Sequence, residues 1–174
     1  MCQAQIVQAK LEACVPELAL RLQTIKAQAD KQPDAPLVSL SGEGIFVKEL
    51  EAALLERRID LAVHSLKDLP LETPQGLSLT AIVERDEPRD ALISRSGQML
   101  DELPPGSRIG TSSLRRRSQL LQRRSDLHMS DIRGNVDTRL RKLDDGQYDA
   151  IVVAACGLIR LGLEDRITEY LPFD

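Results

Sequence analysis

The chain has 174 residues, 42% of them apolar, and a net charge of -4, which allows one substantial hydrophobic core or two small ones. It contains no Trp, two Phe and two Tyr, so we expect no nucleic-acid partner that relies on bases stacking on aromatic side chains. No apolar run is long enough to cross a bilayer and no signal peptide is recognisable, so we expect a cytoplasmic protein with no membrane partner.

The first part of the chain, residues 1–84, predicts an α/β lobe. Apolar residues at helical spacing predict helices at residues 4–13 and 46–56. Residues 27–41 lack periodicity and contain two prolines, which is typical of a mobile loop. Because an apolar run follows the second helix closely, we expect a parallel sheet. Alternating or short apolar runs predict its strands at residues 18–22, 59–63 and 77–83.

A charged segment containing a proline, residues 84–89 (ERDEPR), interrupts this pattern, and we expect a hinge at residues 85–89. A second α/β lobe is predicted at residues 90–174. Its predicted strands lie at residues 91–94, 108–110, 127–129 and 150–154. Its predicted helices lie at residues 113–124 and 136–145 and near Leu158.

The cysteines, Cys2, Cys14 and Cys156, are odd in number and lie far apart. They lack the paired spacing of a zinc site or a disulfide framework, so we expect reduced thiols and no metal site. Cys156 follows a predicted strand, as a nucleophile would. With no adjacent His or Asp to activate it, a small buried core residue is the better interpretation.

The charge is distributed unevenly, because residues 108–142 contain nine Arg and one Lys against three Asp in a protein that is acidic overall. A guanidinium group pairs with two oxygens of one anion, so clustered arginines indicate a nucleic-acid, phosphate or carboxylate ligand. The alternative is a solvated helix face.

Two predicted strands end in segments suited to anion binding. Residues 110–116 (GTSSLRR) combine a strand end, hydroxyl groups and the start of a helix, where free N–H groups and the helix dipole attract anions. Residues 133–135 (RGN) repeat this arrangement before the helix that carries Arg139. No glycine-rich phosphate loop is present, which favours a carboxylate over a nucleotide. Alternatively, Ser112 or Ser113 only caps the helix and the arginines lie in solvent.

Residues 64–68 (HSLKD) leave the end of a predicted strand, at the edge where α/β sheets bind ligands. The Ser, Lys and Asp side chains suit a ligand that has both N–H donors and carboxylates. The alternatives are a core histidine at His64 and a surface ion pair between Lys67 and Asp68.

Six segments together carry a resemblance to a known family: HSLKDLP (64–70), ERDEPRDALIS (84–94), GTSSLRR (110–116), IRGNVDTRL (132–140), YDAIVVAACGL (148–158) and RLGL (160–163). Over essentially its whole length the chain resembles the hydroxymethylbilane synthase (porphobilinogen deaminase) family. These transferases join four porphobilinogen molecules head to tail and release ammonia each time. They do so on a dipyrromethane cofactor that a thioether attaches to a cysteine.

The resemblance implies a fold and a set of partners. It implies two α/β lobes resembling type II periplasmic-binding-protein domains with a hinge between them, and a third α+β domain. The partners would be porphobilinogen and oligopyrrole intermediates, and members are usually monomeric.

The resemblance also implies residue roles. Asp68 would be catalytic, contacting pyrrole N–H groups and stabilising the cation formed when ammonia leaves. Phe46 would lie near the growing chain, although its helical spacing is equally typical of a core residue. The carboxylate-binding residues would be Ser65, Lys67, Thr111, Ser113, Arg115, Arg116, Arg133, Arg139 and Arg160. We expect the arginines at positions 115, 116, 133 and 139 to converge on one basin that faces Asp68.

The chain departs from the family pattern in three respects. Glu43 stands where bacterial members commonly have a lysine, which weakens anion binding locally. We expect a truncation at both ends, with the first strand, the return segment of the first lobe and the third domain missing. None of the three cysteines matches the cofactor-attachment cysteine, so we expect an inactive fragment whose exposed apolar surface promotes association.

An alternative function is a non-enzymatic solute-binding or effector-binding module for a small carboxylate anion, since such modules share this architecture. Asp68 beside Lys67 argues against it, because a pure anion binder gains nothing from a carboxylate in its cleft.

Overall fold

The computed structural model describes residues 2–25 and 47–172. The chain divides into two compact units, Met1–Val83 and Glu84–Asp174. No helix in the described part of the chain is long and apolar enough to span a membrane.

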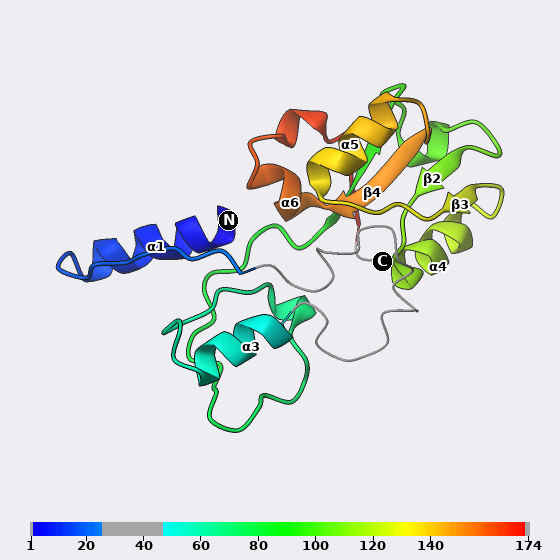
Figure 1. Ribbon diagram of the computed structural model, residues 1–174. Helices are drawn as coiled ribbons and strands as arrows, with labels where there is room; N and C mark the ends of the chain where they lie inside the picture. The colour runs from blue at the N-terminus through cyan, green and yellow to red at the C-terminus, as the bar shows by residue number, and fades with distance from the viewer. Residues whose placement is uncertain (1, 26–46, 173–174) are drawn as a thin grey trace. The chain divides into compact units, whose positions relative to one another are not determined.

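The described part of the first unit is helical and irregular (Figure 1). It contains α1 (Cys2–Cys14), α3 (Lys48–Leu55) and a 3-10 helix, η1 (Leu66–Asp68). The two helices predicted here are confirmed within the described residues. Val47 and Ala53 are the buried apolar side chains among these residues, so the described part of this unit has little core.

The three strands predicted in this unit are wrong, because residues 18–22, 59–63 and 77–83 are irregular. Apolar alternation defines the face that a strand would bury, but a strand forms only where a neighbour supplies ladder hydrogen bonds. Within the described residues these segments have no such neighbour, and Leu61 and Ile82 are 49% and 71% exposed. The loop predicted at 27–41 lies outside the described residues.

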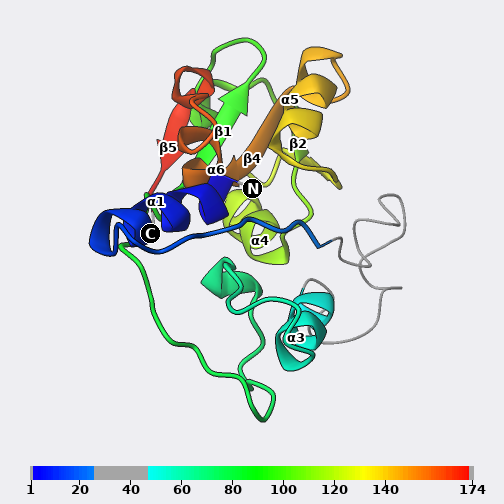
Figure 2. The same ribbon diagram turned by 60° about the vertical axis from the view of Figure 1, so that its left-hand side comes forward.

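The second unit is built on a five-stranded mixed sheet with the order β3-β2-β4-β1-β5. Figure 2 labels β1, β2, β4 and β5, and Figure 1 labels β3. β2 runs parallel to β3 and to β4, whereas β1 is antiparallel to both β4 and β5. The four predicted strands are confirmed, with shifts of one residue at their ends, and the fifth was not predicted. The strands are β1 (Asp90–Ser94), β2 (Arg108–Gly110), β3 (His128–Ser130), β4 (Ala150–Ala154) and β5 (Glu169–Leu171).

Helices follow the ends of β2, β3 and β4, as the sequence predicted. Polar side chains cap the N-termini of two of them. Ser113 Oγ accepts a hydrogen bond from the backbone N–H of Arg116, and Asn135 Oδ1 accepts one from the backbone N–H of Thr138. The helices are α4 (Leu114–Arg123), α5 (Val136–Asp144) and α6 (Ala155–Ile159), with 3-10 helices η2 (Leu100–Glu102) and η3 (Glu164–Arg166).

The core of the second unit covers both faces of the sheet, because β1 and β4 bury alternate side chains on opposite sides. Ile93 and Ile151 pack with the buried residues of α5 and α6 in one cluster. Leu92 and Val152 pack with those of α4 and η2 in the other. Figure 1 shows α5 in front of β4, on the first of these faces. The second unit is therefore a three-layer α/β structure with a mixed sheet.

Candidate active site

All five strands of the second unit have one end at the same side of the sheet. β2 and β4 run parallel and end there, next to β3. β1 runs the opposite way, so its first residue, Asp90, pairs with Ala154 at the end of β4 and with Leu171 at the end of β5. This is the edge at which α/β sheets bind ligands.

The turn from β2 into α4 uses its hydroxyl groups internally. Thr111 is fully buried, and its Oγ1 accepts the backbone N–H of Ser113 at 3.3 Å. Ser113 is the N-cap of α4, and its Oγ accepts the Arg116 N–H at 3.5 Å. Gly110 is required here, because a Cβ at this position would lie 2.9 Å from the Tyr148 ring. The turn therefore fixes the direction in which the next two arginines leave the helix.

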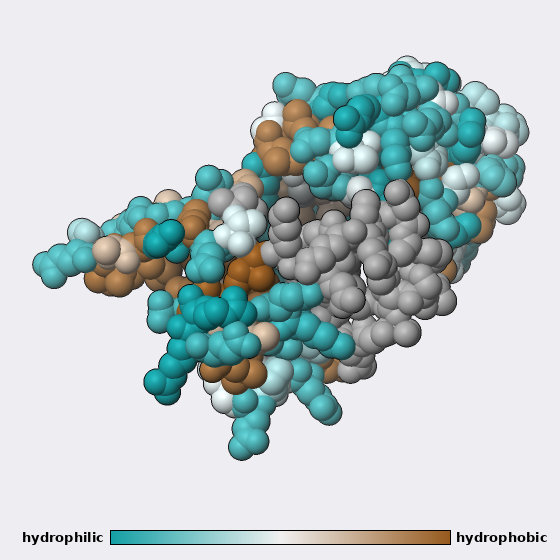
Figure 3. All heavy atoms as spheres, viewed as in Figure 1, coloured by the Kyte–Doolittle hydropathy of each residue, from teal (hydrophilic) through white to brown (hydrophobic). Residues whose placement is uncertain are grey.

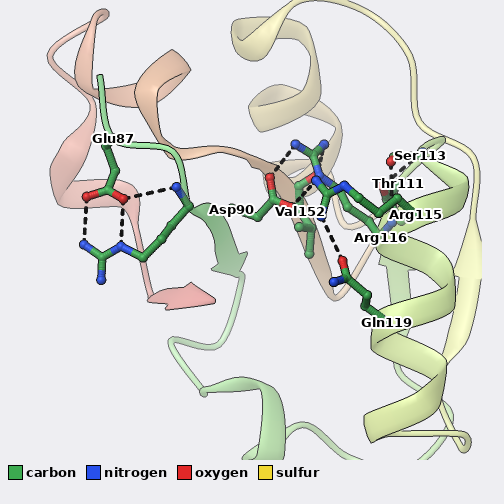
Figure 4. A network of polar contacts seen from close by, with 9 residues as sticks. Glu87, Asp90, Thr111, Ser113, Arg115, Arg116, Gln119 and Val152 are labelled. Carbon is green, nitrogen blue, oxygen red and sulfur yellow. Dashed lines mark hydrogen bonds and ion pairs between the residues drawn. The ribbon is translucent and has the colours of Figure 1, made fainter. Parts of the chain in front are cut away.

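Asp90 holds both of these arginines (Figure 4). Its two carboxylate oxygens each accept one hydrogen bond at 2.7 Å, from Arg115 and from Arg116. Arg116 also donates to the carbonyl oxygen of Val152 at 3.3 Å, and Arg115 to Oε1 of Gln119 at 2.8 Å. The side chains of Arg116 and Asp90 are each 13% exposed, whereas that of Arg115 is 61% exposed.

The ionisation of Asp90 follows from these contacts. Burial raises the pKa of Asp90, but the hydrogen bonds and charges of Arg116 and Arg115 outweigh it, and the pKa is lowered from its ordinary value. At neutral pH the cluster therefore contains two guanidinium cations and one carboxylate, a net charge that can attract an anion.

Arg139 and Arg133 belong to the turn from β3 into α5. Nε of Arg139 donates to the carbonyl oxygen of Gly134 at 2.8 Å, and Nζ of Lys142 donates to that of Arg133 at 3.3 Å. Burial, and then the charge of Arg116, lower the pKa of Arg139. The charge of Arg116 therefore acts on Arg139 in this second turn, as expected because β2 and β3 are neighbouring parallel strands.

The segment before β1 binds arginines as well. Asp86 forms an ion pair with Arg160, at the C-terminal end of α6. Glu87 accepts two hydrogen bonds from the guanidinium of Arg89, at 2.7 and 2.8 Å. These hydrogen bonds from Arg89 lower the pKa of Glu87 to about 2. Asp86 and Glu87 are therefore partners of arginines, a role that the sequence did not indicate.

A cavity of about 340 Å³ adjoins the Asp90 cluster, within the size range of small-ligand sites. Arg115 and Arg116 are the predicted site residues that line it. Its other polar residues are Asp90, Gln119 and Arg123, and its apolar residues are Pro88, Leu100, Leu120, Val152, Leu171 and Pro172. Cationic and apolar walls together suit a flat, apolar ring system that carries carboxylate arms.

The predicted site residues of the first unit surround η1. Oγ of Ser65 accepts a hydrogen bond from Nε2 of Gln3 at 2.8 Å. Lys67 and Asp68 are exposed, and the backbone N–H of Asp68 donates to the carbonyl oxygen of Ser65 at 3.0 Å. Phe46 and Glu43 lie outside the described residues.

The remaining predictions concern metals and thiols. No cluster of three or more metal-ligating side chains occurs within residues 2–25 and 47–172. Cys14 is exposed, whereas Cys2 and Cys156 are half-buried. Cys156, in α6, is therefore less enclosed than a fully buried core residue.

A family model described as porphobilinogen deaminase, dipyromethane cofactor binding domain, matches residues 1–174. The chain belongs to the porphobilinogen deaminase family. The predicted resemblance is confirmed. Porphobilinogen deaminases are transferases of tetrapyrrole and heme biosynthesis that act on porphobilinogen and oligopyrrole intermediates. The matched domain is the one that binds dipyrromethane. The cavity fits this group chemically, since its guanidinium groups suit carboxylate arms and its apolar wall suits pyrrole rings.

Sequence reasoning missed Asp90, the residue that joins Arg115 and Arg116 of α4. A signal was present, because the segment ERDEPRDALIS contributes to the family resemblance. Its acidic residues suggested only a hinge. Their pairing depends on β1 lying antiparallel beside β4, which no local pattern revealed.

Proposed function

We propose that the chain carries the substrate-binding and catalytic residues of hydroxymethylbilane synthase, the enzyme that condenses four porphobilinogen molecules head to tail with release of ammonia. The observation that carries this proposal is the pair of guanidinium groups, Arg115 and Arg116, at a partly apolar cavity in a dipyrromethane-binding domain. Porphobilinogen has acetate and propionate arms, and a guanidinium group binds a carboxylate through two hydrogen bonds at once.

Carboxylate arms would be bound by side chains from several turns. Thr111 is fully buried, so in this proposal it holds Ser113 in place and contacts no ligand. Phe46 would lie near the growing chain. The remaining carboxylate-binding residues would be Ser65, Lys67, Ser113, Arg115, Arg116, Arg133, Arg139 and Arg160.

The proposal includes two α/β lobes resembling type II periplasmic-binding-protein domains, with a hinge at residues 85–89. The division of the chain between Val83 and Glu84 supports a hinge at this place. The three-layer structure of the second unit supports the α/β class for that lobe.

Asp68 would be the catalytic residue. Its carboxylate, exposed on η1, would accept hydrogen bonds from pyrrole N–H groups. When ammonia leaves porphobilinogen, positive charge develops on the ring system, and a fixed carboxylate stabilises that charge in the transition state. Dipyrromethane, when bound, would supply the nucleophilic pyrrole carbon for this condensation.

The test is to incubate the purified chain with porphobilinogen and measure bound substrate by calorimetry, released ammonia and hydroxymethylbilane. We expect Asp68→Asn to fold normally and to lower whatever turnover is measured at least about a hundredfold, because the lost interaction acts on the transition state. Substrate binding should change much less. Equal turnover in both proteins, measured well above the rate without protein, would remove Asp68 from the mechanism.

The same experiment separates the alternative function. A solute-binding or effector-binding module would bind small carboxylates without releasing ammonia and without any dependence on Asp68. In our proposal none of Cys2, Cys14 and Cys156 attaches the cofactor, and none of them lines the cavity. The intact mass of the chain should therefore stay unchanged after incubation with preformed hydroxymethylbilane.

A further inference from the structure

The Asp90 carboxylate occupies the donor groups that a ligand carboxylate would use. Arg115 and Arg116 each give it one hydrogen bond at 2.7 Å, and all three residues line the cavity. A ligand that reaches these arginines therefore meets a resident carboxylate.

We infer that Asp90 is a positioning residue that keeps Arg116 fixed and competes with ligand carboxylates for Arg115. This inference rests on the proposed function, because it concerns the same carboxylate-binding site. It assigns different roles to Arg115 and Arg116, two adjacent arginines that the sequence alone does not distinguish.

Arg116 is the fixed member of the pair. Its side chain is 13% exposed and is held at both ends of the guanidinium group, by Asp90 and by the carbonyl oxygen of Val152. Breaking the ion pair between Arg116 and Asp90 would leave a largely buried cation and a largely buried carboxylate unpaired. This costs free energy in a site of low dielectric constant. Arg116 should therefore stay in place when a ligand binds.

Arg115 is the exchangeable member. Its side chain is 61% exposed, and its second nitrogen donates to Gln119 on the same helix. If a ligand carboxylate takes the place of the Asp90 Oδ2 atom, Asp90 keeps its hydrogen bond to Arg116 through Oδ1. Neither carboxylate is then left buried without a cation, so the exchange avoids the usual cost of breaking an ion pair.

The inference predicts that Asp90→Asn binds porphobilinogen about fivefold more tightly, since an amide competes for Arg115 less well than a carboxylate. The matched control is Glu87→Gln, which removes one negative charge from the same segment but touches Arg89 instead. We expect no comparable gain in the control. An equal gain in both variants would reduce the effect to overall charge and would overturn the inference, as would weaker binding by Asp90→Asn.

A second measurement needs no substrate. Treatment with p-hydroxyphenylglyoxal, which modifies guanidinium groups, followed by peptide mass spectrometry gives the rate at which each arginine reacts. Arg115 should react several times faster in Asp90→Asn than in the unaltered chain, with no change in Glu87→Gln. An unchanged rate in Asp90→Asn overturns the inference. If porphobilinogen fails to bind the unaltered chain, the proposed function fails, while the reaction rates still decide the role of Asp90.

A second pair of variants tests the different roles of Arg115 and Arg116 on the folded chain. Arg115→Gln should keep the melting temperature of the unaltered chain and bind porphobilinogen at least about tenfold more weakly. Arg116→Gln should lower the melting temperature. Equal melting temperatures for these two variants would overturn the division.

Discussion

At the scale of single residues, the second unit places carboxylates against three of the arginines that the sequence proposed for binding an external anion. Asp90 bridges Arg115 and Arg116, and Asp86 pairs with Arg160. Clustered arginines in a sequence therefore do not by themselves mean unoccupied guanidinium groups. The exposed fraction of the side chain distinguishes Arg115 from Arg116. Arg115 is largely exposed and accessible to a ligand, whereas Arg116 is largely buried.

The Asp90 cluster predicts a pH dependence of stability. The pKa of Asp90 in the folded protein lies below its ordinary value of 3.8, so the ionised form is the one that the fold stabilises. The stabilisation is complete above that ordinary value and is lost as the pH falls through the lower pKa of the folded state. Asp90→Asn should lower the free energy of unfolding by roughly 2 kcal/mol at neutral pH. This is less than the loss expected for a fully buried ion pair, because the amide oxygen of Asn still accepts a hydrogen bond.

Urea unfolding of the unaltered chain and of Asp90→Asn at pH 7 and at pH 3 measures this dependence. The difference in the free energy of unfolding between the two proteins should be smaller at pH 3 than at pH 7. A difference that does not change with pH would mean that the charge of Asp90 does not stabilise the fold.

At the scale of elements, the two helices that follow β2 and β3 begin with caps of unequal quality. Asn135 Oδ1 accepts the Thr138 N–H at 2.9 Å, whereas Ser113 Oγ accepts the Arg116 N–H at 3.5 Å, the limit of a hydrogen bond. A good side-chain cap satisfies an otherwise unpaired N–H group at the helix start. Ser113 therefore has hydrogen-bonding capacity left for a ligand.

This difference predicts the outcome of two alanine substitutions. Asn135→Ala should lower the free energy of unfolding by about 1 kcal/mol, and Ser113→Ala should lower it by less. Ser113→Ala should instead weaken porphobilinogen binding, with Asn135→Ala as the matched control for helix stability. Calorimetric binding and thermal unfolding of both variants separate the two effects. A larger loss of stability in Ser113→Ala would assign Ser113 to capping alone.

At the scale of the whole molecule, the two units bury apolar side chains to very different degrees. Among the described residues, eleven large apolar side chains are exposed in the first unit and five in the second. Figure 3 shows the corresponding hydrophobic surface, in brown, along α1 and around α3. Exposed apolar surface of this kind favours association between protein molecules.

We therefore expect the chain to associate as its concentration rises. Light scattering coupled to size-exclusion chromatography should show a mass above 19.3 kDa that increases with loading. Replacing Leu61, Leu66 and Ile82 with Ser should lower the average mass, while the same change at Leu121 and Leu161 of the second unit should have less effect. A monomer at all loadings would mean that these apolar side chains are covered within one molecule.

The sequence by itself determined the family, through motifs that match over the full chain, and most elements of the second unit. Helical spacing and short apolar runs located α4, α5, β1, β2, β3 and β4, because each is buried on a face that the local pattern encodes. The sequence also identified the arginines and hydroxyl groups at the strand ends as candidates for anion binding.

The tertiary structure alone decided how these residues are paired. The antiparallel insertion of β1 between β4 and β5 brings Asp90 to the arginines of α4, across 25 residues of sequence. β5 forms through its pairing with β1, and its three residues show no pattern of their own. The strands predicted in the first unit lack a partner among the described residues, since ladder hydrogen bonds depend on which segment lies alongside. Pairing of this kind joins residues far apart in the chain, so it cannot be deduced from local spacing.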